Sequence, residues 1–137
     1  MLPTVCACSK LRRSARVATA LYDEALAPAG LSVTQFSLLR MLVRAGPSSL
    51  TSFAEATGYD RTTLNRTLGP LQKMGLIQSR GGKDQRTRII SLTENGKAAI
   101  RRAEPHWEEA QQRIAAKLGS DQAALFALLD KVEGLRA

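Results

Sequence analysis

The chain has 137 residues, a length typical of a single domain with a substantial core. Its hydrophobic fraction of 44% suits a folded globular protein, and no apolar run approaches the roughly 18 residues of a membrane span. The net charge of +8 favours a polyanionic partner. An aromatic content of only 4% argues against binding of single-stranded nucleic acid through stacked bases.

The N-terminal stretch MLPTVCACSKLRR places apolar residues before its charges, which is the reverse of a secretory signal. We therefore expect a cytoplasmic protein whose cysteines, Cys6 and Cys8, are kept reduced. Two interpretations of these cysteines remain open. They pack an N-terminal arm as small apolar side chains, or they form a redox switch in which nearby basic residues or a helix N-terminus favour the thiolate.

A helical pattern covers residues 10–27, and Pro28 and Gly30 end it. The next helix follows Ser32, which is predicted to form a capping box with Gln35. Apolar residues lie nearly all round this second helix, so we expect it to be central and buried. These residues are Phe36, Leu38, Leu39, Met41, Leu42 and Val43.

Residues 49–75 predict a helix-turn-helix. A first short helix carries four residues on one buried stripe, namely Leu50, Phe53, Ala54 and Thr57. Gly58 ends this helix and Asp60 caps the next one, which buries Leu64, Leu68 and Leu71. The opposite face of the second helix carries side chains that donate to phosphate oxygens or base edges, and these are Arg61, Thr62, Thr63, Asn65 and Arg66.

The hydrophobic period changes from 3.6 to 2 after Gly75, which predicts strands at Leu76–Arg80 and Thr87–Leu92 with a turn between them. The second helix of a helix-turn-helix is called the recognition helix, and a β-hairpin that follows it is called a wing. Its tip is basic, and we expect four of its residues to meet DNA: Lys83, Asp84, Arg86 and Arg88. In this interpretation the Asp84 carboxylate orients the Arg86 guanidinium; the alternative is a solvated turn with a plain ion pair.

Thr93 predicts the start of a long helix that runs to about Leu118 and contains Pro105. Apolar residues recur along it at the seven-residue spacing of a helix–helix seam. Gly119 breaks the chain, and Ser120 is expected to cap a last helix. The apolar stripe of that last helix has nothing in the winged unit to cover it.

Three segments together resemble the MarR family of bacterial transcription regulators. DQR at residues 84–86 followed by LTENG at residues 92–96 resembles the family's D-x-R…L-T-x-x-G wing pattern. DRTTL at residues 60–64 and LQKMGLI at residues 71–77 resemble the start and exit of its recognition helix. Gly69-Pro70, which predicts a kink, departs from the commonest pattern, but the resemblance extends over nearly the whole chain.

The resemblance implies a mainly α fold with a small β-hairpin wing, formed by one MarR-type domain. Residues 31–96 would be the winged helix-turn-helix, and residues 1–30 and 97–137 a helical dimerisation region intertwined with a second subunit. The residues expected in that interface are Leu11, Ile100, Trp107, Ile114, Leu125, Leu129 and Val132.

The same resemblance implies a repressor that acts as a homodimer on a palindromic operator in double-stranded DNA. A small anionic or aromatic effector would bind between the winged and dimerisation regions, where Arg16 or Arg40 meets its carboxylate. The alternative is a winged-helix protein-interaction module whose basic face is incidental. The Asp84/Arg86 wing favours DNA, since an interaction module has no reason to carry it.

The sequence offers no recognisable set of catalytic residues. The single histidine, His106, has no further His or Cys at the spacing of metal ligands. No Gly-rich phosphate loop, nucleophile elbow or paired carboxylate stands out. We therefore expect no catalysis, no metal and no cofactor.

Overall fold

The computed structural model describes residues 5–81 and 88–136, and most of them are helical. In chain order the elements are α1 (Ala7–Leu26), η1 (Ala27–Ala29), α2 (Val33–Ala45), β1 (Ser48–Ser49), α3 (Leu50–Thr57), α4 (Arg61–Lys73), β2 (Ile77–Gly81), β3 (Arg88–Leu92), α5 (Glu94–Leu118), α6 (Asp121–Glu133) and η2 (Gly134–Arg136). The predicted mainly α fold with a small wing is confirmed.

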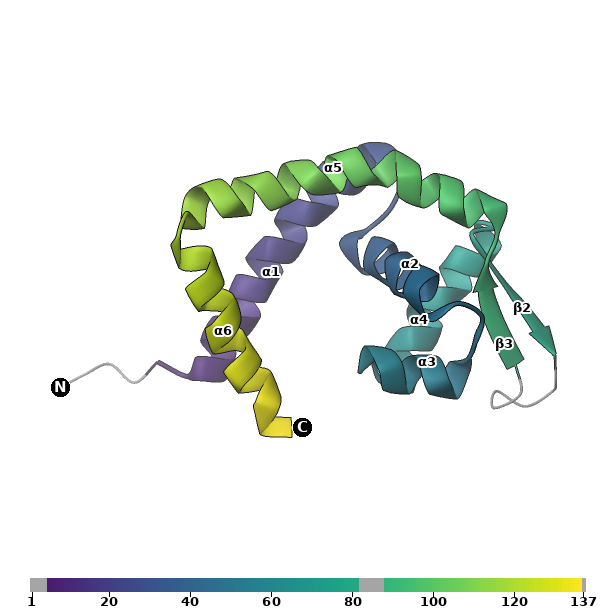
Figure 1. The fold of residues 1–137 in the computed structure, drawn as a ribbon, viewed down its shortest axis with the longest axis horizontal. Coiled ribbons are helices and arrows are strands. Elements are labelled where there is room, and N and C mark those ends of the chain that lie inside the picture. Colours follow the sequence, from purple (N-terminus) through teal and green to yellow (C-terminus); the bar gives the residue numbers. More distant parts are fainter. Residues whose placement is uncertain (1–4, 82–87, 137) are drawn as a thin grey trace.

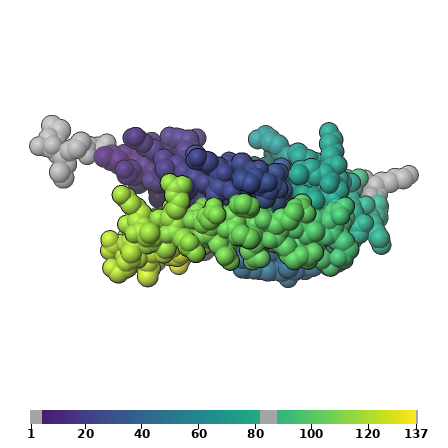
Figure 2. Space-filling view, turned by 90° about the horizontal axis from the view of Figure 1, so that it is seen from above, coloured from purple at the N-terminus to yellow at the C-terminus, as the bar shows by residue number. Residues whose placement is uncertain are grey.

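Helix α5 is the longest helix and extends from one end of the molecule to the other. It arches over the top in Figure 1, with α6 descending from one end and the winged unit, α2 to β3, lying below the other. Helix α1 slants from beneath the middle of α5 down toward α6. Seen from above in Figure 2, α5 runs alongside the segment from α1 to α2 for much of its length. One continuous helix therefore links the winged unit to α6 at the C-terminal end of the chain.

The sheet has three antiparallel strands in the order β1-β3-β2. Ile77 pairs with Leu92 and Gly81 with Arg88, which confirms the predicted hairpin. The short strand β1 adds the pairing of Ser48 with Ile90, and the sequence did not predict it. Two residues show no alternation that a periodicity argument can detect.

The core forms around α2, as predicted. Phe36, Leu38, Leu39 and Leu42 are buried there, and they pack with the apolar faces of α3, α4, β2, β3 and α5. Val43, however, is 56% exposed, so the expectation that α2 is buried all round is wrong at this position. The exposed residues of α2 are the last three, Val43, Arg44 and Ala45.

The helix ends follow the sequence with one exception. Ser32 and Gln35 form the predicted capping box, and Asp23 Oδ1 of α1 accepts from Val33 N at 2.7 Å, which ties α1 to the start of α2. Helix α4 continues through Gly69 and Pro70 to Lys73. Ser120 does not cap α6: its backbone is already helical, and its side chain makes no capping bond.

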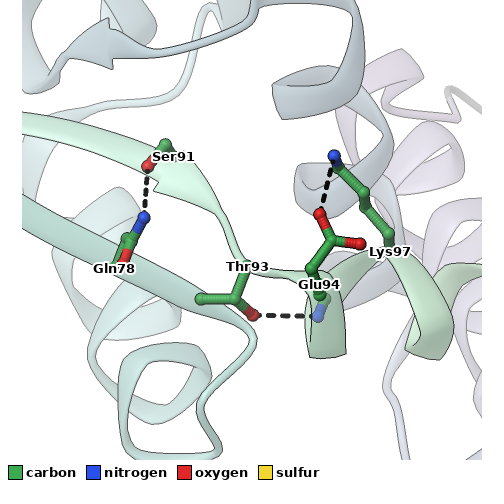
Figure 3. A network of polar contacts seen from close by, with 6 residues as sticks. Gln78, Ser91, Thr93, Glu94 and Lys97 are labelled. Carbon is green, nitrogen blue, oxygen red and sulfur yellow. Dashed lines mark hydrogen bonds and ion pairs between the residues drawn. The ribbon is translucent and has the colours of Figure 1, made fainter.

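The start of α5 is fastened to the exit of α4. Thr93 Oγ1 accepts from Gly96 N at 3.0 Å, the predicted cap, and also donates to the Gly75 carbonyl at 2.6 Å. Thr93 N donates to the Leu76 carbonyl at 3.1 Å. Figure 3 shows Thr93 at this junction, beside the Glu94–Lys97 ion pair of the first turn of α5. The L-T-x-x-G segment thus begins α5 and anchors it to the turn after the recognition helix.

Across residues 5–81 and 88–136, no single helix is long and apolar enough to span a membrane. The segments Ala7–Ala29 and Val33–Ala45 meet the length and composition limits only when taken together, with a 76° bend between them.

Candidate nucleic-acid interface

The recognition helix α4 is built by local signals on either side of a tight turn. Gly58 ends α3 with a φ of +76°, which favours a residue without a Cβ. Asp60 Oδ1 then accepts from Thr63 N at 2.7 Å and caps α4. The hydrogen bonds from Thr63, together with the charge of Arg66, hold the pKa of the Asp60 carboxyl below its usual value. Leu64, Leu68 and Leu71 are buried, so the orientation of α4 is fixed by its apolar face.

The opposite face of α4 is polar and open to solvent. Arg61, Thr62, Asn65 and Arg66 are exposed, and Thr63 is half-buried beside the cap. These five residues are the set that the sequence predicted for DNA contact, and the structure brings them together on the first two turns. Such side chains donate hydrogen bonds to phosphate oxygens, and they also carry groups that distinguish base edges.

The wing continues this surface. Arg80 and Arg88 are exposed near the described ends of β2 and β3. The predicted contacts of Lys83, Asp84 and Arg86 lie outside the described residues.

A cavity of about 140 Å³ lies between α4 and the sheet, and both Asn65 and Arg88 line it. One predicted residue of the recognition helix and one of the wing thus face the same cavity. Gln72 and Ser79 share this cavity, and sequence reasoning missed both because neither stands out in a pattern dominated by basic side chains.

A second residue that the sequence did not indicate is Thr51 in the first turn of α3. Its Oγ1 accepts a hydrogen bond of 3.0 Å from Nη2 of Arg61. The two residues are ten positions apart, and their contact depends on the angle between two helices, which a linear pattern does not reveal.

Two of the residues expected in a dimer interface pack within the chain itself. Trp107 lies against Phe36 with ring centroids 5.8 Å apart, and Ile100 also contacts the core of the winged unit. Ile114 lines open grooves between α1 and α5. The others lie on α1 and α6 near the chain ends: Leu11, Leu125 and Val132 are exposed and Leu129 is half-buried.

The two arginines that the sequence offered as alternatives at an effector site lie on different helices, α1 and α2. The Arg40 guanidinium stacks over the ring of Trp107 at 4.3 Å and over Phe36 at 5.6 Å. It also lines a cavity of about 190 Å³ with Val43, Arg44, Ile100 and Glu104. Arg16 is exposed on α1 and does not line that cavity.

Both cysteines are exposed free thiols at the start of α1, so neither packs against the rest of a single chain. Cys6 precedes the first helical residue, and hydrogen bonds from Ser9 lower the pKa of its thiol. His106 is half-buried, and no group of three or more metal-ligating side chains occurs in the described part of the chain.

Comparison with known proteins agrees with this architecture. A sequence profile of the MarR family matches residues 29–87. Over 85 residues the chain is 31% identical to YwoH, an uncharacterised HTH-type transcriptional regulator of Bacillus subtilis (strain 168), and the match spans 62% of the length of each protein. Over 134 residues it is 30% identical to YwaE, a second uncharacterised HTH-type regulator of that organism, covering 96% of this chain and 78% of YwaE.

A solved structure is similar along nearly the whole chain. It is the M. tuberculosis transcriptional regulator MosR in complex with DNA, with a TM-score of 0.80 and 35% sequence identity, covering 97% of this chain and 100% of the MosR chain. A fold, a family profile and relatives that span nearly the full length all agree. The chain belongs to the MarR family of transcription regulators.

Proposed function

We propose that this protein is a homodimeric repressor that reads a palindromic operator in double-stranded DNA through α4. The observation that carries the proposal is the capped recognition helix itself. Its apolar side is locked into the core by Leu64, Leu68 and Leu71, and its exposed side presents Arg61, Thr62, Asn65 and Arg66. A helix-turn-helix places such a face in the major groove.

The charge and the comparisons support the same function. A net charge of +8 raises affinity for DNA irrespective of its sequence. MosR, at 35% identity, has been crystallised with DNA. The basic wing belongs to the proposal as well, with Arg88 lining the same cavity as Asn65 and with the sequence-predicted contacts of Lys83, Asp84 and Arg86.

The homodimer is supported by apolar side chains that one chain leaves in water. On α6 and in the segment after it, Leu128 is 58% exposed, Phe126 53% and Leu135 81%, and α6 has no buried residue. Val17 on α1 is 66% exposed. Such a concentration of exposed apolar surface is typical of an interaction site, and two-fold pairing of the chain ends would cover it and space two α4 helices for a palindrome.

Regulation by a small molecule or by oxidation completes the proposal. The cavity beside Arg40 is lined by the guanidinium groups of Arg40 and Arg44, by the apolar Val43 and Ile100, and by one carboxylate, Glu104. The two arginines, one of which stacks on Trp107, outnumber that acid and support binding of a small aromatic carboxylate. The exposed Cys6 thiol with its lowered pKa supports a response to oxidants. Because such a regulator acts on chromosomal DNA, we place it in the cytoplasm.

The direct test is selection of bound duplexes from fragmented genomic DNA of the source organism, followed by affinity measurements at several salt concentrations. We expect a palindromic duplex to be enriched, and the logarithm of its binding constant to fall linearly with the logarithm of salt concentration. Failure to enrich any duplex, with no salt-dependent binding, would favour the protein-interaction module instead.

A further inference from the structure

A hydrogen bond joins the first turns of α3 and α4. Arg61 is the first residue of α4, and its Nη2 donates to Oγ1 of Thr51, the second residue of α3, at 3.0 Å. Arg61 is exposed and Thr51 is half-buried. The guanidinium is therefore held at the surface of the protein, on the side of α4 that carries the polar residues.

Among residues 5–81 and 88–136, no acid pairs with this guanidinium. The neighbouring Asp60 carboxylate accepts from Thr63 N as the cap of α4. Within residues 5–81 and 88–136 the one ion pair joins Lys97 to Glu94, at the start of α5. An arginine carries five N–H donors in a fixed plane, so the bond to Thr51 leaves most of them for an anion.

We propose that Thr51 is a positioning residue that holds Arg61 for contact with a DNA phosphate. The inference rests on the proposed function, because it takes α4 as the helix that meets DNA. In a helix-turn-helix the recognition helix enters the major groove while the preceding helix crosses the backbone, so the junction between their first turns faces phosphates. A long side chain that is already held loses less conformational freedom on binding, and the contact is correspondingly tighter.

The test compares two substitutions at Thr51 by fluorescence anisotropy on the selected operator. Thr51→Val removes the hydroxyl at nearly constant volume and weakens operator binding about two- to tenfold, the net effect of one hydrogen bond. Thr51→Ser keeps the hydroxyl and binds like the wild type. The matched control is Thr19→Val on α1, whose hydroxyl bonds to its own helix at Ala15, and it leaves the affinity unchanged.

A double-mutant cycle then separates positioning from direct contact. Arg61→Ala weakens binding and lowers the salt slope by about one. In that background Thr51→Val has no further effect, because its only role is to hold Arg61. Thermal unfolding of each variant verifies that the fold is retained.

Two results would overturn the inference while leaving the proposed function standing. In the first, Thr51→Val weakens binding equally with and without Arg61, which would make Thr51 itself the DNA contact. In the second, Arg61→Ala binds the operator as tightly as the wild type does. If the wild-type protein selects no operator at all, both the inference and the proposed function fail.

Discussion

Gly96 lies directly against the main-chain carbonyl of Leu76. A Cβ at residue 96 would overlap the Leu76 oxygen and stand 2.9 Å from Cδ2 of Leu92. Thr93 closes the same junction by bonding to Gly75 and Leu76. The contact joins the first turn of α5 to the turn that follows α4, so the placement of the recognition helix depends on the absence of a side chain at residue 96.

Substitution of Gly96 by alanine is therefore expected to destabilise the protein. The added methyl group meets main-chain atoms that cannot move aside without shifting a helix, and we expect a loss of about 3 kcal/mol in the free energy of unfolding, at the upper end for overpacking. The control is Gly69→Ala in α4, where a Cβ meets nothing within 4 Å. It should be neutral or stabilising. Urea denaturation measures both, and equal stability of the two variants would contradict the account of this junction.

The dimer proposal predicts that a charge on the exposed stripe of α6 separates the subunits. Leu128→Glu should make the protein sediment as a monomer at micromolar concentration. It should also reduce operator affinity, because each monomer then binds its half-site independently. Val43→Glu is a matched control when no effector is added, since Val43 is 56% exposed against 58% for Leu128 but lies on α2, at the cavity beside Arg40. A wild-type protein that sediments as a monomer would contradict the proposal.

Binding of an aromatic carboxylate at Arg40 is expected to alter the fluorescence of Trp107, the single tryptophan of the chain. Titration with benzoate should give a saturable change. Arg40→Ala should weaken benzoate binding at least about tenfold, as expected for loss of a charge-assisted hydrogen bond. Arg16→Ala serves as the control, because Arg16 does not line the cavity. The same response in Arg40→Ala and the wild type would exclude this site.

The reactivity of Cys6 is expected to depend on Ser9. Because the Ser9 hydrogen bonds lower the pKa of the Cys6 thiol, Ser9→Ala raises that pKa and leaves less thiolate at neutral pH. Alkylation by iodoacetamide, measured in a Cys8→Ser background so that only Cys6 reacts, should be slower at pH 7 and regain its rate at high pH. Ser14→Ala, whose hydroxyl bonds to the Lys10 carbonyl, is the control. An unchanged rate in Ser9→Ala would show that the thiolate is not favoured in this way.

The features that the sequence predicted are those encoded by neighbouring residues. The Asp60 cap, the Gly58 turn, the buried leucines of α4 and the Thr93 cap each need only a few consecutive positions, and all are confirmed. The sequence did not predict the short strand β1, because its pairing partner, Ile90, lies some forty residues away and a strand of two residues shows no period.

The sequence also did not predict which side chains of different helices contact each other. Trp107 fits a helix–helix seam by spacing, yet it packs on Phe36 and Arg40 of its own chain. The bond between Thr51 and Arg61 depends on how α3 and α4 cross. Ser120 has the residue type of a cap, but Gly119 leads the chain into α6 with Ser120 already helical, so its side chain has no capping role.

The central claim is that α4 reads the base sequence of DNA, and Arg66 tests it most directly. The measurement is the affinity of Arg66→Ala for the selected operator and for a random duplex, beside Arg113→Ala on α5 as a control for the loss of one charge. We predict that Arg66→Ala loses about 1–3 kcal/mol of discrimination between the two duplexes. Arg113→Ala should keep the wild-type ratio. Equal loss of affinity for operator and random DNA in Arg66→Ala would make Arg66 a phosphate contact and contradict its role in base recognition, and wild-type affinity for both would contradict the claim that α4 is the reading helix.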